Sequence, residues 1–140
     1  AFLENNIAAV VAAGKVLKVD LSTLDYSKFP GIERRQSILH QSPTRTIVED
    51  YAHHPTEIKE LLKGVRHVYK KEDIVCVFQP HRISRLKDLK KEFCSSFKNA
   101  NSVILCPIYS AGEKLKLGFN YLNFAKTIIK NKLEELRSRP

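Results

Sequence analysis

Two short polar clusters hold the residues of this sequence whose types and spacing could do chemistry. They occupy residues 50–55 (Asp-Tyr-Ala-His-His-Pro) and 79–85 (Gln-Pro-His-Arg-Ile-Ser-Arg). Arg82 and Arg85 are three positions apart, so both could bind one carboxylate or phosphate, helped by free backbone N–H groups and the dipole at a helix start. Alternatively, they form ordinary surface ion pairs. The motif alone leaves both interpretations open.

The first cluster adds a carboxylate and two imidazoles, from Asp50, His53 and His54. A carboxylate at a strand end could accept a hydrogen bond from a ribose hydroxyl, hold a water on magnesium, or cap its own turn. His54 precedes Pro55, which favours the first helical position, so His54 could simply lead into a helix. Neighbouring side chains in an extended loop point apart, and no third ligand has a recognisable spacing. The sequence therefore predicts no metal site.

Each polar cluster lies between a short apolar run and a run with helical periodicity. In a right-handed parallel βαβ unit, both strand-to-helix loops open at the carboxyl edge of the sheet. We therefore expect the two clusters to meet in one crevice, joined there by the loop at 107–118. The predicted strands are 46–50, 74–78 and 102–106, and the helices between them follow Pro55 and run from Leu86 to Phe97.

The remaining segments complete an α/β fold in which strands alternate with helices. Pro30 and Gly31 break the chain, and we expect a domain boundary there that separates residues 1–30 from residues 31–140. The other predicted elements are a helix at 2–18, a short helix at 22–28 with Ser22 as N-cap, a strand at 34–40, a turn at 42–44 and a final helix at 120–137.

The composition is that of a globular protein, with 43% hydrophobic and 28% charged residues among 140. No apolar run reaches the roughly 18 residues that a membrane span requires. Three cysteines are an odd and sparse set, and no basic-then-apolar leader opens the chain, so we expect a cytoplasmic protein. The sequence contains no methionine, which leads us to expect a piece of something longer.

The formal net charge of +9 raises the question of nucleic acid. The lysines are spread over predicted helix surfaces and do not form one tract with aromatic residues, which favours solvated faces and predicts neither a nucleic-acid nor a membrane partner. A non-catalytic basic binding module, for nucleic acid or a partner protein, is the alternative from another class. The five glycines form neither G-x-x-x-x-G-K-[ST] nor G-x-G-x-x-G, so ATP phosphates, if used, would be held elsewhere.

Several motifs in the right order resemble the Mur ligases. The two polar clusters, extended to residues 50–58 and 77–85, are similar to motifs of the C-terminal domain of that family. Supporting matches are the Asn-plus-alanine helix at 4–9, the Gly-x-x-Arg-Arg segment at 31–35 and the Tyr-x-Ala-Gly-Glu loop at 109–113.

The resemblance implies an α/β, Rossmann-like C-terminal domain with a mainly parallel sheet flanked by helices. Residues 1–30 would end the central ATPase domain, and 31–140 would be the amino-acid-binding domain, incomplete at its end. Family members phosphorylate a substrate carboxylate with ATP and Mg²⁺, and an amino-acid amine then displaces phosphate. The closest motifs imply joining of L-alanine to UDP-N-acetylmuramate. The N-terminal and central domains would be needed as partners, and this piece alone should be inactive.

The resemblance also implies roles for single residues. Asn5, Arg35 and Asp50 would contact the nucleotide. Arg82 and Arg85 would hold the carboxylate of L-alanine, which suits bidentate geometry. His53 is the candidate catalytic residue, because a nearby imidazole could accept the proton of the attacking amine. The other candidate substrate-binding residues are Tyr51, His54 and His81.

A close alternative is the relative that joins UDP-N-acetylmuramate to a murein tripeptide during recycling. Arg34, Arg35 and Gln36 would suit that enzyme. Arg82 and Arg85 favour the L-alanine enzyme, because both are present to hold a free carboxylate.

Overall fold

The computed structural model describes residues 2–23, 32–114 and 119–137, with side chains except at 2–7, 23 and 136. The chain divides into two compact units, Ala1–Tyr51 and Ala52–Pro140. The domain boundary expected at Pro30 and Gly31 falls on residues outside the described ranges and stays a prediction. Within those ranges, no helix is both long and apolar enough to cross a membrane.

The first unit opens with helix α1 (Phe2–Val16), as its apolar periodicity predicts. Gly14 is buried, and a Cβ there would lie 2.7 Å from Cδ1 of Leu21, so a larger residue would require the Leu21 side chain to move. A 3₁₀ turn, η1 (Leu21–Thr23), stands where a helix was expected from residue 22, and residues 24–28 lie outside the described ranges. Asp20 Oδ1 accepts from both the N–H and the Oγ of Ser22, at 2.9 and 2.6 Å, while the role of Ser22 as N-cap of a helix over 22–28 stays a prediction.

Strands β1 (Ser37–Gln41) and β2 (Thr46–Glu49) form an antiparallel hairpin. Its turn is closed by hydrogen bonds between the backbones of Ser42 and Arg45, at 2.8 and 3.4 Å. The prediction that 46–50 pairs in a parallel sheet with 74–78 is wrong for the described residues, whose strands form two two-stranded sheets, β1–β2 and β3–β4. A turn of a few residues closes the hairpin at a small entropic cost, which favours this local pairing.

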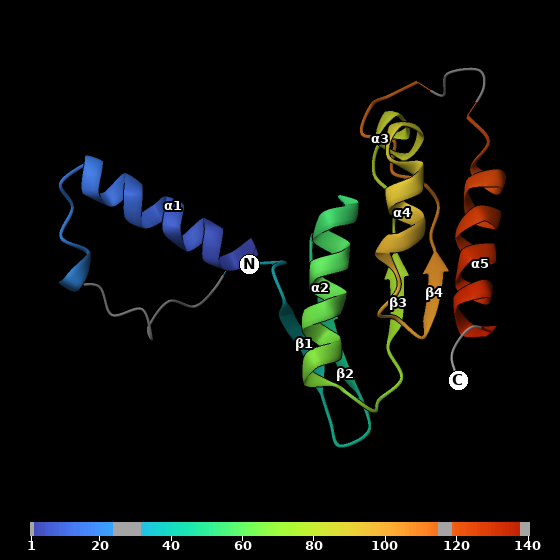
Figure 1. The fold of residues 1–140 in the computed structure, drawn as a ribbon, viewed down its shortest axis with the longest axis horizontal. Coiled ribbons are helices and arrows are strands. Elements are labelled where there is room, and N and C mark those ends of the chain that lie inside the picture. Colours follow the sequence, from blue (N-terminus) through green and yellow to red (C-terminus); the bar gives the residue numbers. More distant parts are fainter. Residues whose placement is uncertain (1, 24–31, 115–118, 138–140) are drawn as a thin grey trace. The chain divides into compact units, whose positions relative to one another are not determined.

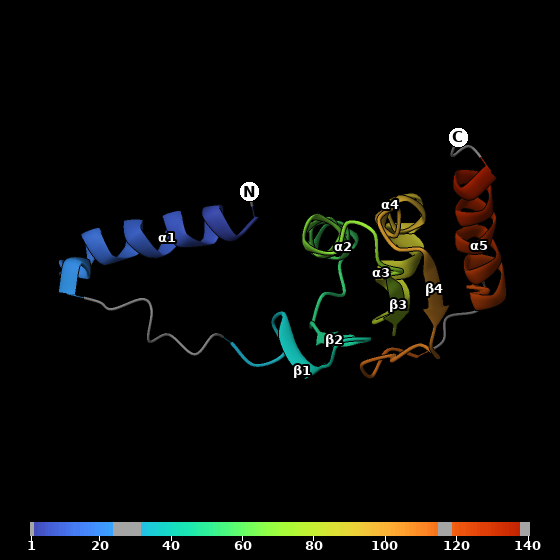
Figure 2. The same cartoon turned by 90° about the horizontal axis from the view of Figure 1, so that it is seen from below.

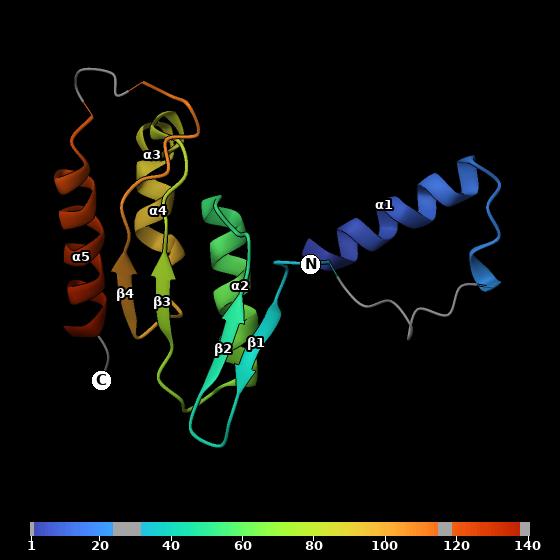
Figure 3. The same ribbon diagram turned by 180° about the vertical axis from the view of Figure 1, so that it is seen from behind.

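The second unit is built on the parallel strands β3 (Val75–Phe78) and β4 (Ser102–Leu105), which lie side by side in Figure 3. Parallel strands need a crossover, supplied here by helices α3 (Ile83–Asp88) and α4 (Lys90–Ser96). The strands and helices expected here are therefore confirmed, together with α2 (Pro55–Val68) and α5 (Tyr121–Arg137). One difference is that the helix expected at 86–97 unwinds at Leu89 (φ −110°, ψ 28°).

Helix α4 lies between α2 and α5, in front of the sheet in Figure 1 and above it in Figure 2. Alternate strand residues point to these helices, as the strand period of two requires. The core is aromatic at its centre, where Phe93 contacts Phe78 and Phe124 at ring-centroid distances of 5.8 Å. Its other buried members include Ile58, Leu62, Leu86, Phe97 and Ile128.

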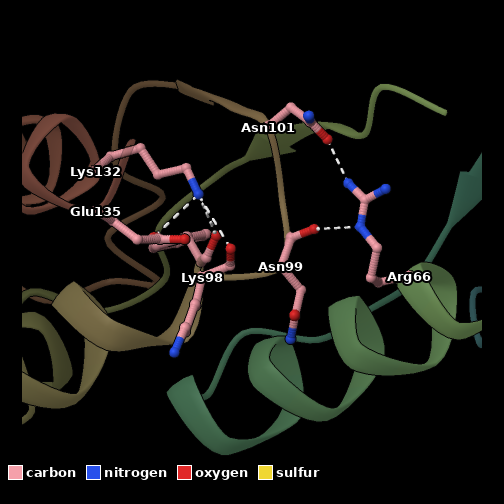
Figure 4. A network of polar contacts seen from close by, with 7 residues as sticks. Arg66, Lys98, Asn99, Asn101, Lys132 and Glu135 are labelled. Atoms are coloured by element: carbon pink, nitrogen blue, oxygen red, sulfur yellow. Dashed lines mark hydrogen bonds and ion pairs between the residues drawn. The ribbon is translucent and has the colours of Figure 1, made fainter. Parts of the chain in front are cut away.

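Two cationic side chains tie the helices to the amino ends of β3 and β4 (Figure 4). Arg66 of α2 donates to the carbonyls of Asn99 at 3.3 Å and Glu72 at 2.8 Å, and to the side chain of Asn101. Lys132 of α5 donates to the carbonyl of Lys98, which follows α4, at 3.1 Å. Both charges are used to satisfy backbone and amide oxygens between elements.

Candidate functional site

The loops that follow β3 and β4 continue the parallel pairing beyond the strands. Cys106 N–H donates to the carbonyl of Phe78, and Tyr109 N–H to that of Pro80, both at 2.9 Å. Arg82 N–H then donates to the carbonyl of Tyr109 at 3.0 Å, next to a parallel bridge between His81 and Tyr109. These hydrogen bonds make the carboxyl edge of the sheet a fixed platform, on which residues 79–85 are held against the loop that follows β4.

Three rings meet on this platform. His53 and His81 are stacked, with ring centroids 5.5 Å apart and planes inclined by 12°. His81 also meets Tyr109 edge to face at 5.3 Å. The structure thus brings His53 and His81 together as the sequence predicted, and adds Tyr109, which the sequence reasoning did not include among the site residues.

His53 and His54 are held by the start of α2. Glu57 Oε2 accepts the backbone N–H of His53 at 3.0 Å and that of His54 at 3.1 Å, and it lies 3.9 Å from Nδ1 of His53. His54 Nδ1 accepts the N–H of Thr56 at 3.3 Å, which makes His54 the N-cap. The ring of His54 is therefore engaged in helix capping, the simpler of the two interpretations of this residue, while its role in substrate binding stays a prediction.

Arg82 and Arg85 lie at the start of α3, where Arg82 is the N-cap. Neither guanidinium has a hydrogen bond or ion pair among the described residues, which leaves both cationic groups available to a ligand. The backbone of Arg82 has φ 65° and ψ 123°. Residues other than glycine rarely adopt this conformation, which costs about 1–3 kcal/mol. Strain of this kind persists only where the surrounding contacts enforce it.

The N–H of Ser84 in α3 is not free for a ligand, which corrects one expectation from the sequence. Glu113 Oε2 accepts this N–H at 3.0 Å, and Oε1 accepts the Ser84 hydroxyl at 2.7 Å. These bonds, first the one from the hydroxyl and then the one from the N–H, lower the pKa of Glu113 below its ordinary value of 4.5, and the nearby charge of Arg82 adds a smaller effect. The carboxylate is therefore ionised at neutral pH.

The first unit holds a second group of predicted residues. Asp50 Oδ2 accepts the N–H of Gln36 at 3.0 Å, and its Oδ1 lies 3.8 Å from the guanidinium of Arg35. The guanidinium carbons of Arg34 and Arg35 lie 5.0 and 5.8 Å from the ring centroid of Tyr51. Tyr51 was predicted to bind the amino acid. Its ring lies beside Arg34 and Arg35, in the same unit as Arg35 and Asp50, which were predicted to bind the nucleotide.

Asn5 lies in α1, but its side chain is outside the described part of the chain. Among the described residues, no three His, Cys, Asp or Glu side chains gather closely enough to hold a metal ion.

Three organising residues were missed by the sequence reasoning, namely Glu57, Ser84 and Glu113. Glu57 had a readable signal, because an acidic residue three positions after an N-cap indicates a capping box. Ser84 and Glu113 lie 29 positions apart and meet only through the fold. Glu113 was visible within the Tyr-x-Ala-Gly-Glu motif, but its partner was not.

Comparison with known proteins decides the family. A model described as "Mur ligase, glutamate ligase domain" matches residues 34–136. The chain belongs to the Mur ligase family. Among Mur ligases, it is 53% identical over 130 residues to the UDP-N-acetylmuramate–L-alanine ligase of Pelagibacter ubique, which covers 92% of this chain and 28% of that protein. It is 49% identical over 86 residues to the enzyme of the same name from Magnetococcus marinus, covering 61% of this chain and 18% of that protein.

A solved Mur ligase structure has the same fold. The crystal structure of UDP-N-acetylmuramate-alanine ligase MurC from Thermotoga maritima matches with a TM-score of 0.58 and 31% identity, over 91% of this chain and 26% of that one. The predicted α/β class, with a parallel sheet and flanking helices, is thereby confirmed. The chain spans about a quarter of the length of the proteins it matches, for example 28% of the Pelagibacter ubique enzyme.

Proposed function

We propose that this chain is the amino-acid-binding part of a cytoplasmic UDP-N-acetylmuramate:L-alanine ligase of peptidoglycan precursor synthesis. The observation that carries the proposal is that helix α3 starts with Arg82 and Arg85, whose guanidinium groups have no hydrogen bond or ion pair among the described residues. Arg82 directly follows His81, whose ring stacks on His53 and meets Tyr109 edge to face. A guanidinium can bind a carboxylate through two parallel N–H bonds. The names of the relatives support L-alanine as that amino acid.

The reaction proposed for the whole enzyme has two steps. The carboxylate of UDP-N-acetylmuramate takes the γ-phosphoryl group of ATP, which gives ADP and an acyl phosphate. The amine of L-alanine then attacks the acyl carbon, an amide bond forms, and inorganic phosphate leaves. Mg²⁺ would neutralise phosphate charge in this reaction, held mainly by parts of the enzyme outside this chain.

This chain's contribution to the second step is to hold and deprotonate the amine. Arg82 and Arg85 would hold the α-carboxylate, and orientation of this kind accounts for much of the rate of bimolecular reactions in enzymes. His53 would accept the proton that the amine loses, and Glu57, 3.9 Å from its Nδ1, would stabilise the resulting imidazolium. Arg35 and Asp50, with Asn5, would contact the nucleotide, and the family resemblance makes Tyr51, His54 and His81 further candidates for binding the substrate.

The test is ATP-dependent phosphate release by the full-length ligase with UDP-N-acetylmuramate and either L-alanine or the murein tripeptide. We expect release with L-alanine, and we expect Arg82→Ala to raise the KM for L-alanine by about tenfold or more, the usual cost of a charge-assisted hydrogen bond. Release only with the tripeptide would assign the chain to the recycling relative. Release with neither, with steeply salt-dependent binding of DNA or RNA, would favour a basic binding module.

A further inference from the structure

We propose that Glu113 is a positioning residue for the amino-acid site, which acts by fixing the backbone of Arg82 through Ser84. The inference rests on the proposed function, because it assumes that Arg82 binds the substrate carboxylate. Glu113 touches neither the rings nor the two guanidinium groups in any hydrogen bond or ion pair of the described residues. We therefore assign it a positioning role, beside the smaller electrostatic interaction between Glu113 and Arg82.

The peptide on each side of Arg82 is held by a hydrogen bond, one to the loop after β4 and one within α3. Its N–H donates to the carbonyl of Tyr109 at 3.0 Å, and its carbonyl accepts the N–H of Leu86 at 3.3 Å. These two bonds hold a φ of 65° that the chain would leave if it were free to relax. The direction in which the Arg82 side chain leaves the platform depends on this conformation.

Glu113 supplies the third constraint, on the residue two positions later. Both of its carboxylate oxygens bind Ser84, one to the N–H at 3.0 Å and one to the hydroxyl at 2.7 Å. A two-point contact fixes orientation as well as distance, since rotation about either bond breaks the other. The contact joins the loop after β4 to the start of α3, the same two segments that the Arg82–Tyr109 bond joins.

The loop is shaped to present this carboxylate. Ala111 and Gly112 both have positive φ, 52° and 82°, and Glu113 N–H then donates to the carbonyl of Ser110 at 3.1 Å. A Cβ at Gly112 would meet nothing within 4 Å, so glycine is required there for its backbone conformation and not for space. The turn therefore points Glu113 back toward α3.

A structural role alone would be a poor explanation for this contact. Ser84 is exposed, and its hydrogen bonds to Glu113 are open to water, where such bonds contribute little to overall stability. The benefit of the contact is local, because it restrains a strained residue that is expected to touch substrate. The expected signature is a change in the KM for L-alanine with little change elsewhere.

The experiment measures the KM for L-alanine, the KM for ATP and kcat in the full-length ligase with Glu113→Ala, Ser84→Ala and the control Glu92→Ala. Glu92 is exposed on α4, so Glu92→Ala removes the same charge as Glu113→Ala but outside the site. We expect Glu113→Ala to raise the KM for L-alanine about tenfold, Ser84→Ala about threefold, and Glu92→Ala not at all, with kcat and the KM for ATP within about twofold throughout.

The double variant Arg82→Ala/Glu113→Ala tests whether Glu113 affects L-alanine binding only through Arg82. If Glu113 acts through Arg82, its removal should raise the KM for L-alanine no further once Arg82 is gone. Glu113→Gln, which keeps one acceptor oxygen for the Ser84 N–H, should recover at least half of the lost affinity. Should Glu113→Ala fail to fold, Ser84→Ala and Glu113→Gln carry the same test.

Three results would overturn the inference, and they can be told apart. A wild-type KM for L-alanine in Glu113→Ala, Glu113→Gln and Ser84→Ala, beside a raised KM in Arg82→Ala, would leave the proposed function standing and remove the role of Glu113. An unchanged KM for L-alanine in Arg82→Ala would overturn the proposed function, and the inference with it. Equal losses in all variants and in every kinetic constant would show a structural role only.

Discussion

The two ends of the β3–β4 sheet carry the same kind of charge and use it differently. At the amino end, Arg66 donates to the carbonyls of Tyr69, Glu72 and Asn99, and Lys132 donates to those of Phe97 and Lys98 (Figure 4). At the carboxyl end, Arg82 and Arg85 have no such partners among the described residues. Charges at the amino end serve the fold, whereas those at the carboxyl end remain available to a ligand.

Backbone strain follows the same division. Arg82, Ala111 and Gly112 have positive φ at the carboxyl end, while within the described residues of this unit none is found near Arg66 or Lys132. Strained conformations cost stability and cluster where binding requires a fixed geometry. The comparison therefore predicts that substitutions at the amino end lower the free energy of unfolding, whereas removal of the arginines at the carboxyl end raises the KM for L-alanine.

The largest expected effect on stability is at Arg66. Arg66→Ala removes the donors of several carbonyls between α2 and the strands, and we expect it to lower the free energy of unfolding of the 140-residue chain by about 3 kcal/mol. Urea unfolding followed by circular dichroism measures this change. Arg85→Ala is the matched control and should change it by less than about 0.5 kcal/mol. Equal losses in the two variants would break the comparison.

A smaller effect of the same sign is expected at Lys132. Its side chain is 10% exposed and reaches two carbonyls and Glu135, whereas that of Lys130 is 74% exposed and pairs only with Glu134 among the described residues. Replacement by methionine keeps the apolar stem, so Lys132→Met should cost about 1 kcal/mol and Lys130→Met about 0.3 kcal/mol. The same urea unfolding experiment compares them. A larger loss at Lys130 would show that surface charge, not carbonyl binding, matters at this end.

The opposite sign is expected at Arg82. Arg82→Gly relieves the positive φ of 65°, so it should raise the free energy of unfolding by up to about 1 kcal/mol while it removes the guanidinium. Arg85→Gly, inside α3, should instead lower it by about 1 kcal/mol, because glycine disfavours a helix. Thermal unfolding of both variants checks the two signs. A loss of stability in Arg82→Gly would mean that this residue is not strained.

The smallest effect concerns pH. The bonds from Ser84 lower the pKa of Glu113 below 4.5 in the folded chain, so the stability that they contribute is present above pH 4.5 and is lost as the pH falls through the lower, folded pKa. An NMR titration of the Glu113 side-chain carbonyl carbon measures that pKa directly. Ser84→Ala should move the pKa back up toward 4.5, and a titration that Ser84→Ala leaves unchanged would show that the contact is absent in solution.

The sequence predicted most of the second unit, since local patterns determine its elements. Helix α2 has an apolar stripe and a proline at its start, and the apolar runs at β3 and β4 lie between loops and helices that periodicity identifies. The βαβ rule explains why the loops after β3 and β4 lie on one edge, with His81 paired to Tyr109. His53 was also expected beside His81 and is found there, but the parallel strand assumed before it pairs with β1 instead.

What the sequence could not predict depends on contacts between distant residues or on competing partners. The run at 46–50 looked like one more parallel strand, yet it pairs with the neighbouring strand β1 across a short turn. Arg66 carries the same charge as Arg82 but was not singled out in the sequence, and only the fold shows that its guanidinium binds several carbonyls. The contact of Glu113 with Ser84 had no signal at either residue alone.

The most direct test measures two quantities on the same pair of variants, Arg82→Ala and Arg66→Ala: the KM for L-alanine of the full-length ligase and the free energy of unfolding of this chain. The account predicts a crossed pattern. Arg82→Ala should raise the KM about tenfold or more with no loss of stability, and Arg66→Ala should lose about 3 kcal/mol with an unchanged KM where the enzyme is folded. Loss of stability without a change of KM in Arg82→Ala would contradict the account.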